Sequence, residues 1–427
     1  MNTEQTTRRE FIKTSAAVGA LATPVGFPAI LSAAPNSNTL RIGLIGCGGR
    51  GTGAAMQALT ADSNVELTAM GDLFEAPLKK SAEILRQKYP DKVKVAPEKC
   101  FIGFDAHEKV IANSDVVLLA TPPGFRPQHL KAAVDAGRHA FVEITLGVDA
   151  PGVRLALEAA ELASKKNLGI LSGFCWRYSA AHRAVVEQIR KGAIGPIRAI
   201  YATYYRGDLS VKFHGEREPG MTDLQWQIRN WYNYSWLSGD VTILLSGGHS
   251  ADKMSWWLDD VMPGKAVAVG SRVYENEGNT FDNCFVVYEY ANGLRGFLGC
   301  RSQARCHNEN ADYIIGSRGV CTIGRSAAPV ITGENEWRYD GPKNNMYQTE
   351  HDEFFVSIRA GKPINDGPRM ARTTLMGIMG RMAAYTGQEI TWDMALNSKE
   401  KLAPDQLDWN TKLELPPLAK PGRTKFI

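Results

Sequence analysis

The sequence predicts an α/β protein in two parts: an N-terminal doubly wound parallel sheet, and a C-terminal α/β part with an open, mainly antiparallel sheet. Two observations support this fold class. Up to residue 171, short apolar runs alternate with helix-like stretches, which is the pattern of βαβ units in a parallel sheet. After Gly173 the runs become β-branched, aromatic and partly alternating, with glycine or asparagine between them, as in antiparallel hairpins.

The first strand, residues 40–45, leads into a glycine-rich turn and a helix over residues 52–59. Gly46 permits the tight turn, Gly48 lets the backbone approach a pyrophosphate, and Gly51 lets the helix pack close to the strand. Phosphates would lie over the helix N-terminus, where free N–H groups favour negative charge. We therefore expect a Rossmann dinucleotide site, rather than a plain chain reversal, at Gly46, Cys47, Gly48, Gly49, Arg50 and Gly51.

The second apolar run, residues 65–71, ends in Asp72. An acidic residue at this strand end, roughly 20 residues beyond the glycines, binds the adenosine ribose hydroxyls in Rossmann folds. Because its carboxylate repels a 2′-phosphate, the sequence favours NAD over NADP. Arg50 is positioned in the turn to neutralise extra phosphate charge, so NADP remains the alternative.

The remaining elements follow in order. In the first part we expect helices at residues 76–89, 106–113, 127–136 and 151–166, and extended segments at residues 93–104, 116–120, 139–143 and 168–171. In the second part we expect strands at residues 197–205, 266–274, 284–290, 294–300 and 313–315, with few helices between them. A long loop over residues 209–236 and an extended tail after Ala403 complete the chain. These boundaries predict domains at residues 35–171 and 172–427.

The N-terminus has the pattern of an export signal. Arg8 and Arg9 form a twin-arginine motif, and a modestly apolar stretch follows over residues 16–34. This pattern predicts a twin-arginine (Tat) signal peptide over residues 1–34 and a periplasmic mature protein, with an ordinary amphipathic helix as the alternative. No later stretch is long and apolar enough to predict a membrane span.

Charge and composition exclude several classes of function. The formal net charge of +4 comes from scattered Lys and Arg, which argues against nucleic-acid binding. The 7 cysteines form no C-x-x-C motif, and although Cys300 and Cys306 are close enough to be considered as a pair, the odd count argues against a disulfide scaffold. The histidines lack the spacing of metal ligands, so we expect no metal site.

The chain resembles the glucose–fructose oxidoreductase and inositol dehydrogenase family (Gfo/Idh/MocA). The resemblance rests on residues 42–51, 120–123, 129–136, 140–143, 249–252 and 386–389. It implies a Rossmann domain followed by an open α/β domain, a tightly held nicotinamide cofactor at their interface, and a sugar or polyol substrate. It also implies cofactor contacts from Thr121, Pro122, His129 and Glu143. Trp176 and Arg177 are candidates either for cofactor contacts or for cleft wall.

Two positions depart from the family pattern. Members usually have a lysine directly after the residue that matches Glu143, where this chain has Ile144. They also usually have an acidic residue four positions before the histidine that matches His249, where this chain has Leu245. Because neither isoleucine nor leucine transfers protons, two of the three usual proton-handling groups are missing.

The remaining candidates for a catalytic base are therefore His249 and Tyr178, with Tyr232 or Tyr234 as further alternatives. Asp252 lies one helical turn beyond His249 and is expected to orient it. If an imidazole with an ordinary pKa is the base, activity should rise as the pH increases through about 6 to 7, where the imidazole loses its proton.

Three functions are compatible with these residues. The first is a periplasmic NAD(P)-dependent oxidoreductase that acts on a sugar, sugar derivative or cyclitol by hydride transfer. The second is an NAD-dependent glycosidase, because this branch of the family is similar at the position of the missing lysine and uses transient oxidation to assist elimination. The third is a nucleotide-binding protein without activity. The open sheet favours a homodimer or homotetramer, and the aromatic segment 209–236 suits either sugar stacking or a subunit interface.

Overall fold

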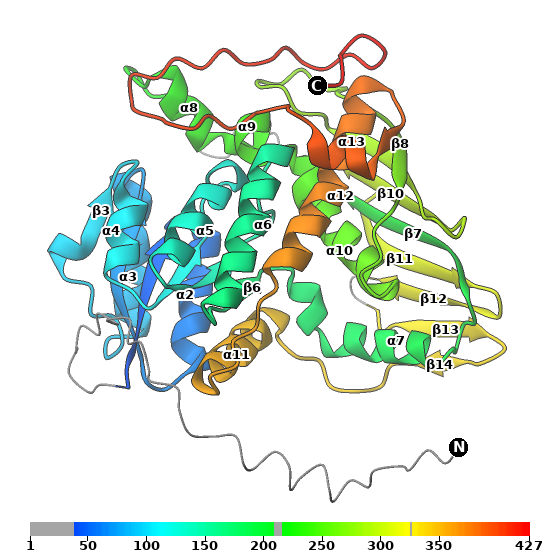
Figure 1. Cartoon of the computed structure of the whole chain (residues 1–427), viewed down its shortest axis with the longest axis horizontal. Coiled ribbons are helices and arrows are strands. Elements are labelled where there is room, and N and C mark those ends of the chain that lie inside the picture. The colour runs from blue at the N-terminus through cyan, green and yellow to red at the C-terminus, as the bar shows by residue number, and fades with distance from the viewer. Residues whose placement is uncertain (1–37, 209–215, 325–326) are drawn as a thin grey trace, which may run out of the picture. The chain divides into compact units, whose positions relative to one another are not determined.

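The computed structural model describes residues 38–208, 216–324 and 327–427. Residues Thr39–Ile427 form one compact unit that contains two sheets (Figure 1). The expected signal peptide, residues 1–34, lies outside the described residues, as does the middle of the expected loop at 209–215.

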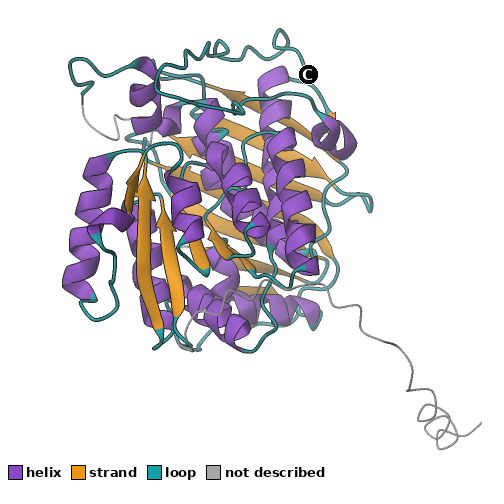
Figure 2. Cartoon of the chain, turned by 60° about the vertical axis from the view of Figure 1, so that its left-hand side comes forward, coloured by secondary structure: helices purple, strands orange, loops and turns teal. Residues whose placement is uncertain are grey.

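The first sheet is the predicted doubly wound sheet. Its six strands are all parallel and lie in the order β3-β2-β1-β4-β5-β6, with helices on both faces (Figure 2). The strands are β1 (Leu40–Ile45), β2 (Val65–Asp72), β3 (Cys100–Ile102), β4 (Val116–Leu119), β5 (His139–Val142) and β6 (Ile170–Ser172). The helices are α2 (Gly49–Ala61), α3 (Glu75–Lys88), α4 (Ala106–Ala112), α5 (Arg126–Asp135) and α6 (Ala150–Lys165), with short turns η1 (Pro97–Lys99) and η2 (Pro123–Phe125).

Local chemistry explains why these elements begin and end where they do. All four residues of β4 are buried, which is why the sequence there is apolar without alternation. Gly137, directly after α5, has φ +73°, a left-handed conformation that favours glycine at a helix end. Asp149 caps α6 by accepting a hydrogen bond from Gly152 N at 2.8 Å. The extended segment expected at 93–104 shortens to β3, because η1 occupies its middle.

The second sheet has nine strands in the order β14-β13-β12-β11-β7-β10-β9-β8-β15. Only β7 and β10 pair in parallel, so the sheet is mainly antiparallel, as predicted. The hairpin turn at Asn292–Gly293 joins β9 to β10, with Gly293 at φ +80°. The strands are β7 (Ile197–Arg206), β8 (Lys265–Ser271), β9 (Asn283–Glu289), β10 (Arg295–Ser302), β11 (Glu309–Gly316), β12 (Gly319–Gly324), β13 (Val330–Gly333), β14 (Trp337–Arg338) and β15 (Ile390–Thr391).

The second part contains more helix than the sequence indicated. The helices are α7 (Ala180–Arg190), α8 (Asp223–Arg229), α9 (Ser235–Ser238), α10 (Gly247–Trp257), α11 (Met346–Arg359), α12 (Gly367–Thr386) and α13 (Trp392–Asn397). Three short helical segments, η3 (Cys175–Tyr178), η4 (Trp231–Asn233) and the π-helical η5 (Val241–Ser246), join them. The segment expected as a long loop therefore contains α8, η4 and α9.

Helix α12 connects the two sheets. It packs against α6 of the first sheet and against β8 of the second, so nearly every residue from Met370 to Thr386 is buried. A helix buried on all sides has no polar face, and its sequence shows no clear helical period. For this reason the sequence analysis does not predict helix α12. Within the described ranges, no helix combines the length and apolarity needed to cross a bilayer.

Candidate functional site

The glycine-rich turn has the geometry that its sequence predicts. Gly46 has φ +93°, and a Cβ there would lie 2.7 Å from the backbone of Ala120 and Thr121. A Cβ on Gly51 would lie 1.9 Å from the carbonyl oxygen of Gly46, so only glycine allows α2 to approach β1 this closely. At Gly48 and Gly49 a Cβ would meet no atom within 4 Å. The backbone there faces open space beside the N-terminus of α2, which is suited to a phosphate group.

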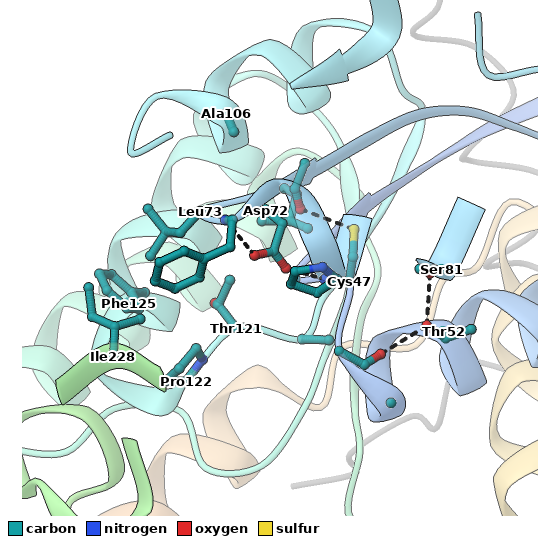
Figure 3. Close-up of a pocket in the computed structure, with 18 of the residues that line it drawn as sticks. Cys47, Thr52, Asp72, Leu73, Ser81, Ala106, Thr121, Pro122, Phe125 and Ile228 are labelled. Atoms are coloured by element: carbon teal, nitrogen blue, oxygen red, sulfur yellow. Dashed lines mark hydrogen bonds between the residues drawn. The ribbon is translucent and has the colours of Figure 1, made fainter. Parts of the chain in front are cut away.

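Asp72 lies across this turn at the end of β2 (Figure 3). Its Oδ2 accepts a hydrogen bond from Cys47 N at 2.7 Å, and its Oδ1 accepts one from Phe74 N at 3.0 Å. Burial raises the pKa of Asp72, while these backbone donors oppose the rise. Cys47 is buried against Gly71 O and is a packing residue, with a thiol pKa raised well above the ordinary value by burial. The carboxylate is thus fixed at the position where a ribose would bind.

A cavity of about 650 Å³ opens in front of these groups. It is lined by the turn, by Asp72, by side chains of α3, and by the ends of β3 and β4. Thr121, Pro122 and His129, from which we expect cofactor contacts, line it, and so do Ile228, Arg229 and Trp231 of the α8–η4 segment. His129 stacks on His107 with ring centroids 4.2 Å apart, and burial lowers its pKa well below the ordinary value, so it is neutral. The size suits a dinucleotide.

Arg50 does not face this cavity. Its Nε donates to Glu143, its Nη2 lies 3.5 Å from Glu350 Oε1, and its guanidinium lies 5.0 Å from the ring centroid of Tyr347. The expectation that Arg50 neutralises an extra phosphate is therefore wrong, because two buried carboxyl groups on the opposite side engage it. Sequence spacing gave no indication of Glu350, which lies on α11, far along the chain.

Glu143, the residue directly after β5, is a buried, fixed carboxylate. Although burial alone would raise its pKa, Arg50 and Arg126 hold it below the ordinary value. Arg126, at the start of α5, also donates from Nη1 to the carbonyl oxygens of Glu143 and Thr145, both at 3.0 Å. Burial lowers the pKa of Arg126 to about 10. Sequence reasoning missed Arg126, since a lone arginine at a helix start has no motif.

His249 lies in the first turn of α10, next to the loop that follows β5. The neighbouring Gly248 would place a Cβ 3.3 Å from Thr145. The imidazole packs edge-on to Phe174, with ring centroids 6.0 Å apart, and its Nδ1 has no hydrogen-bond partner in the described chain. Burial lowers the pKa of His249 to about 4, against the opposing effect of Glu143. His249 is therefore neutral near pH 7, and its Nδ1 is a buried ring nitrogen without a partner in the described chain.

Asp252 does not orient His249. Its carboxylate accepts from Arg177 Nε at 2.9 Å and from Arg369 Nη1 at 3.1 Å, and Arg177 also donates to Asp260 Oδ1 at 2.6 Å. These ion pairs hold η3 against α10 and α12. The expectations that Asp252 assists the base and that Arg177 contacts the cofactor are therefore corrected. The side chains of Asp252 and Arg177 belong to a buried network of ion pairs. The spacing of these residues in the sequence does not reveal that network.

Tyr178 and Trp176 also point away from the cavity. The Tyr178 hydroxyl donates to Asp366 Oδ2 at 3.3 Å, and burial raises the pKa of Tyr178, so the hydroxyl stays protonated at neutral pH and is not poised to act as a base. Trp176 packs on His182, with ring centroids 4.8 Å apart, and Lys253 Nζ lies 5.2 Å from its ring centroid. Neither residue lies where it was expected, beside the cofactor.

We expect Tyr178→Phe to leave turnover within about twofold of wild type, because the hydroxyl serves Asp366 and not a substrate. The free energy of unfolding should fall by about 1 kcal/mol, from the lost hydrogen bond. Steady-state kinetics and urea unfolding check both values, with Tyr347→Phe as a control for removing a tyrosine hydroxyl. A tenfold loss of turnover in Tyr178→Phe alone, about 1.4 kcal/mol, would return this tyrosine to the mechanism.

Comparison with known proteins adds independent findings. The family described as the GFO/IDH/MocA C-terminal domain matches residues 182–322. The inositol 2-dehydrogenase of Cereibacter sphaeroides is 28% identical over 267 residues, which are 62% of this chain and 68% of that protein. A glycosyl hydrolase family 109 protein of Solibacter usitatus is 30% identical over 231 residues, which are 50% of this chain and 49% of that protein.

The fold also has solved counterparts. The structure of a putative oxidoreductase from Thermotoga maritima superposes with a TM-score of 0.66 at 19% identity, and covers 82% of this chain and 100% of that one. Likeness at this identity establishes the shared two-sheet fold. All 7 cysteines are free in the structure, including buried Cys300 and exposed Cys306. Among the described residues, no three His, Cys, Asp or Glu side chains gather as metal ligands would.

Proposed function

Because the chain belongs to the Gfo/Idh/MocA family of oxidoreductases, we propose that it transfers hydride between a tightly bound NAD and a sugar, sugar derivative or cyclitol. The observation that carries this proposal is the cavity in front of the glycine-rich turn. The residues present fit a dinucleotide: the backbone at Gly48 and Gly49 leaves room for phosphate, and Asp72 is fixed where the ribose binds. The named activity of the inositol 2-dehydrogenase relative supports a polyol substrate.

NAD is the proposed cofactor, with NADP as the alternative. The carboxylate of Asp72 disfavours a 2′-phosphate by like-charge repulsion. Arg50, which could have compensated, is engaged by Glu143 and Glu350. When bound, the nicotinamide supplies the hydride acceptor, and the chain's own residues must take the proton of the alcohol.

We assign that proton to His249. Its imidazole is neutral, and its Nδ1 is unpartnered in the described chain. Protonation creates an imidazolium, and the fixed carboxylate of Glu143 stabilises it by charge attraction. Arg50 and Arg126 keep Glu143 ionised and in place. In this way His249 and Glu143 take over the role of the usual lysine, which Ile144 cannot fill.

An NAD-dependent glycosidase is the second candidate. Ile144, in place of the usual lysine, favours it, as does the similarity to glycosyl hydrolase family 109 proteins. The chain spans about half the length of that relative, so its activity enters here only as a proposal. In such a reaction the hydride returns to the substrate in each cycle, with no net change in the cofactor.

One experiment distinguishes these functions. We expect the purified protein to release NAD on denaturation, detected by mass spectrometry. Incubated with free sugars and cyclitols, and separately with aryl glycosides, it should accumulate NADH with a free polyol and release no aglycone. Aglycone release without net NADH, with solvent deuterium in the product, would support the glycosidase. Bound nucleotide with no reaction on either panel would support a binding protein, and no nucleotide binding would exclude all three.

We also propose Tat-dependent export to the periplasm and assembly into a homodimer or homotetramer. The export proposal rests on the twin-arginine motif at Arg8 and Arg9, since the Tat route carries folded, cofactor-loaded proteins. The assembly proposal rests on the second sheet, which exposes Val267 (44%), Val269 (70%) and Ile315 (38%). Fractionation of an arginine-to-lysine double variant and light scattering of the mature protein test the two proposals.

A further inference from the structure

The C-terminal arm, residues 398–427, follows a long path over the molecule after α13. It runs past α9 and α8 and returns to end beside α13 (Figure 1). Hydrogen bonds hold it at several points. Asp149 Oδ2 accepts from Leu402 N at 2.7 Å and from Ala403 N at 3.1 Å, and Asn279 Nδ2 donates to Pro416 O at 3.1 Å. The segment between these two attachments is thus tethered on both sides.

Between the attachments, the arm inserts apolar side chains into one cluster with the cavity walls. The cluster contains buried Leu224, Ile228 and Trp236, and Leu407, Trp409 and Leu413 of the arm pack against it. Ile228 lines the cavity, so the arm and the α8–η4 segment beside the cavity share a single apolar contact region.

Trp409 makes the most direct link to the cavity. Its ring centroid lies 4.7 Å from that of Phe104 and 5.7 Å from that of Phe74. Both phenylalanines line the cavity, one beside Asp72 and the other in the loop after β3. Phe74 also donates its backbone N–H to Asp72 Oδ1 at 3.0 Å. Trp409 therefore lies behind the two aromatic side chains that flank the ribose-binding carboxylate.

We propose that the C-terminal arm is a clasp on the adenosine end of the cavity, with Trp409 as a positioning residue that slows release of the dinucleotide. This inference rests on the proposed function of the cavity. Phe74, Phe104 and the α8–η4 segment all line the cavity that would hold the dinucleotide, and the arm packs against all three in one cluster. Because the clasp is already closed and tethered within the same chain, it acts mainly on the dissociation rate.

The test uses the full-length protein loaded with NADH, whose fluorescence is followed after mixing with excess NAD. We expect Trp409→Ala to raise the dissociation rate about tenfold, since two aromatic pairs are lost. Trp409→Phe should restore most of the wild-type rate. Trp337→Ala is the matched control, because it removes a tryptophan that pairs with Tyr339 at 6.3 Å on the edge of the second sheet, away from the cavity.

The outcomes separate the clasp from the cavity assignment. The clasp is supported if only Trp409→Ala accelerates release while both alanine variants show similar melting temperatures without nucleotide. It is overturned if Trp409→Ala releases NADH at the wild-type rate, or if Trp337→Ala accelerates release equally. If wild type binds neither NADH nor NADPH, the proposed cofactor site itself fails, and the clasp fails with it.

Discussion

Replacing Gly48 with valine is expected to abolish dinucleotide binding while leaving the protein folded. Gly48 is the N-cap of α2, at φ −69° and ψ −176°, an extended conformation that valine adopts without strain. Its Cβ would meet no protein atom within 4 Å, so the branched side chain would extend into the cavity where phosphate approaches the backbone. The valine side chain would keep the phosphate away from the backbone N–H groups of the turn. If two charge-assisted hydrogen bonds are lost, at about 1.5–3 kcal/mol each, the affinity for the dinucleotide falls by at least about 100-fold.

Isothermal titration with NAD and thermal unfolding measure the two effects. Gly264→Val is the matched control, because a Cβ there meets only ordinary contacts at the start of β8, far from the turn. Gly51→Val provides the contrast: its Cβ would clash with Gly46 O, so we expect that variant to lose stability as well as binding. Wild-type NAD affinity in Gly48→Val would remove the glycine-rich turn from the binding site.

Replacing His249 with asparagine is expected to lower turnover at least ~10²-fold with little change in NAD binding. Asparagine keeps a polar side chain of similar width but cannot accept and hold a proton. Since His249 does not line the cavity in front of the glycine-rich turn, the affinity for NAD should stay within about threefold of wild type. Single-turnover kinetics on the substrate found in the panel, together with NAD titration, check both expectations.

The pH profile supplies a second, independent measurement. An imidazole accepts a proton only in its neutral form, and burial holds the pKa of His249 at about 4. Turnover should therefore be flat from about pH 5 to about pH 8 and fall as the pH drops through about 4, not through the 6 to 7 of an ordinary histidine. The free energy of unfolding should be measured over the same pH range, because protonation of the buried histidines in acid destabilises the folded state. An unchanged rate in His249→Asn would exclude this residue as the base.

The corrected residues share one physical cause. Arg50, Arg177, Tyr178 and Asp252 stand at positions that suggest cofactor or proton chemistry, yet each is engaged by a partner remote in sequence. A buried charged or polar group must find a partner, and the partners Glu350, Asp366 and Arg369 come from helices α11 and α12 or the turn between them. The spacing of residues along the chain gives no information about such partners. A prediction based on spacing alone therefore assigns catalytic or cofactor-binding roles to too many polar and charged residues.

Local sequence was sufficient to predict the elements whose cause is local. The order of strand, glycine turn and helix, the position of Asp72, the parallel first sheet and the mainly antiparallel second sheet follow from backbone sterics and from the periodicity of apolar residues. The tertiary structure was needed to establish which charges pair, which histidine nitrogens lie buried without a partner in the described chain, and where the C-terminal arm packs. Those outcomes depend on burial and on contacts between residues far apart in the chain: burial lowers the pKa of His249, and Arg50 pairs with Glu143, which lies 93 positions away.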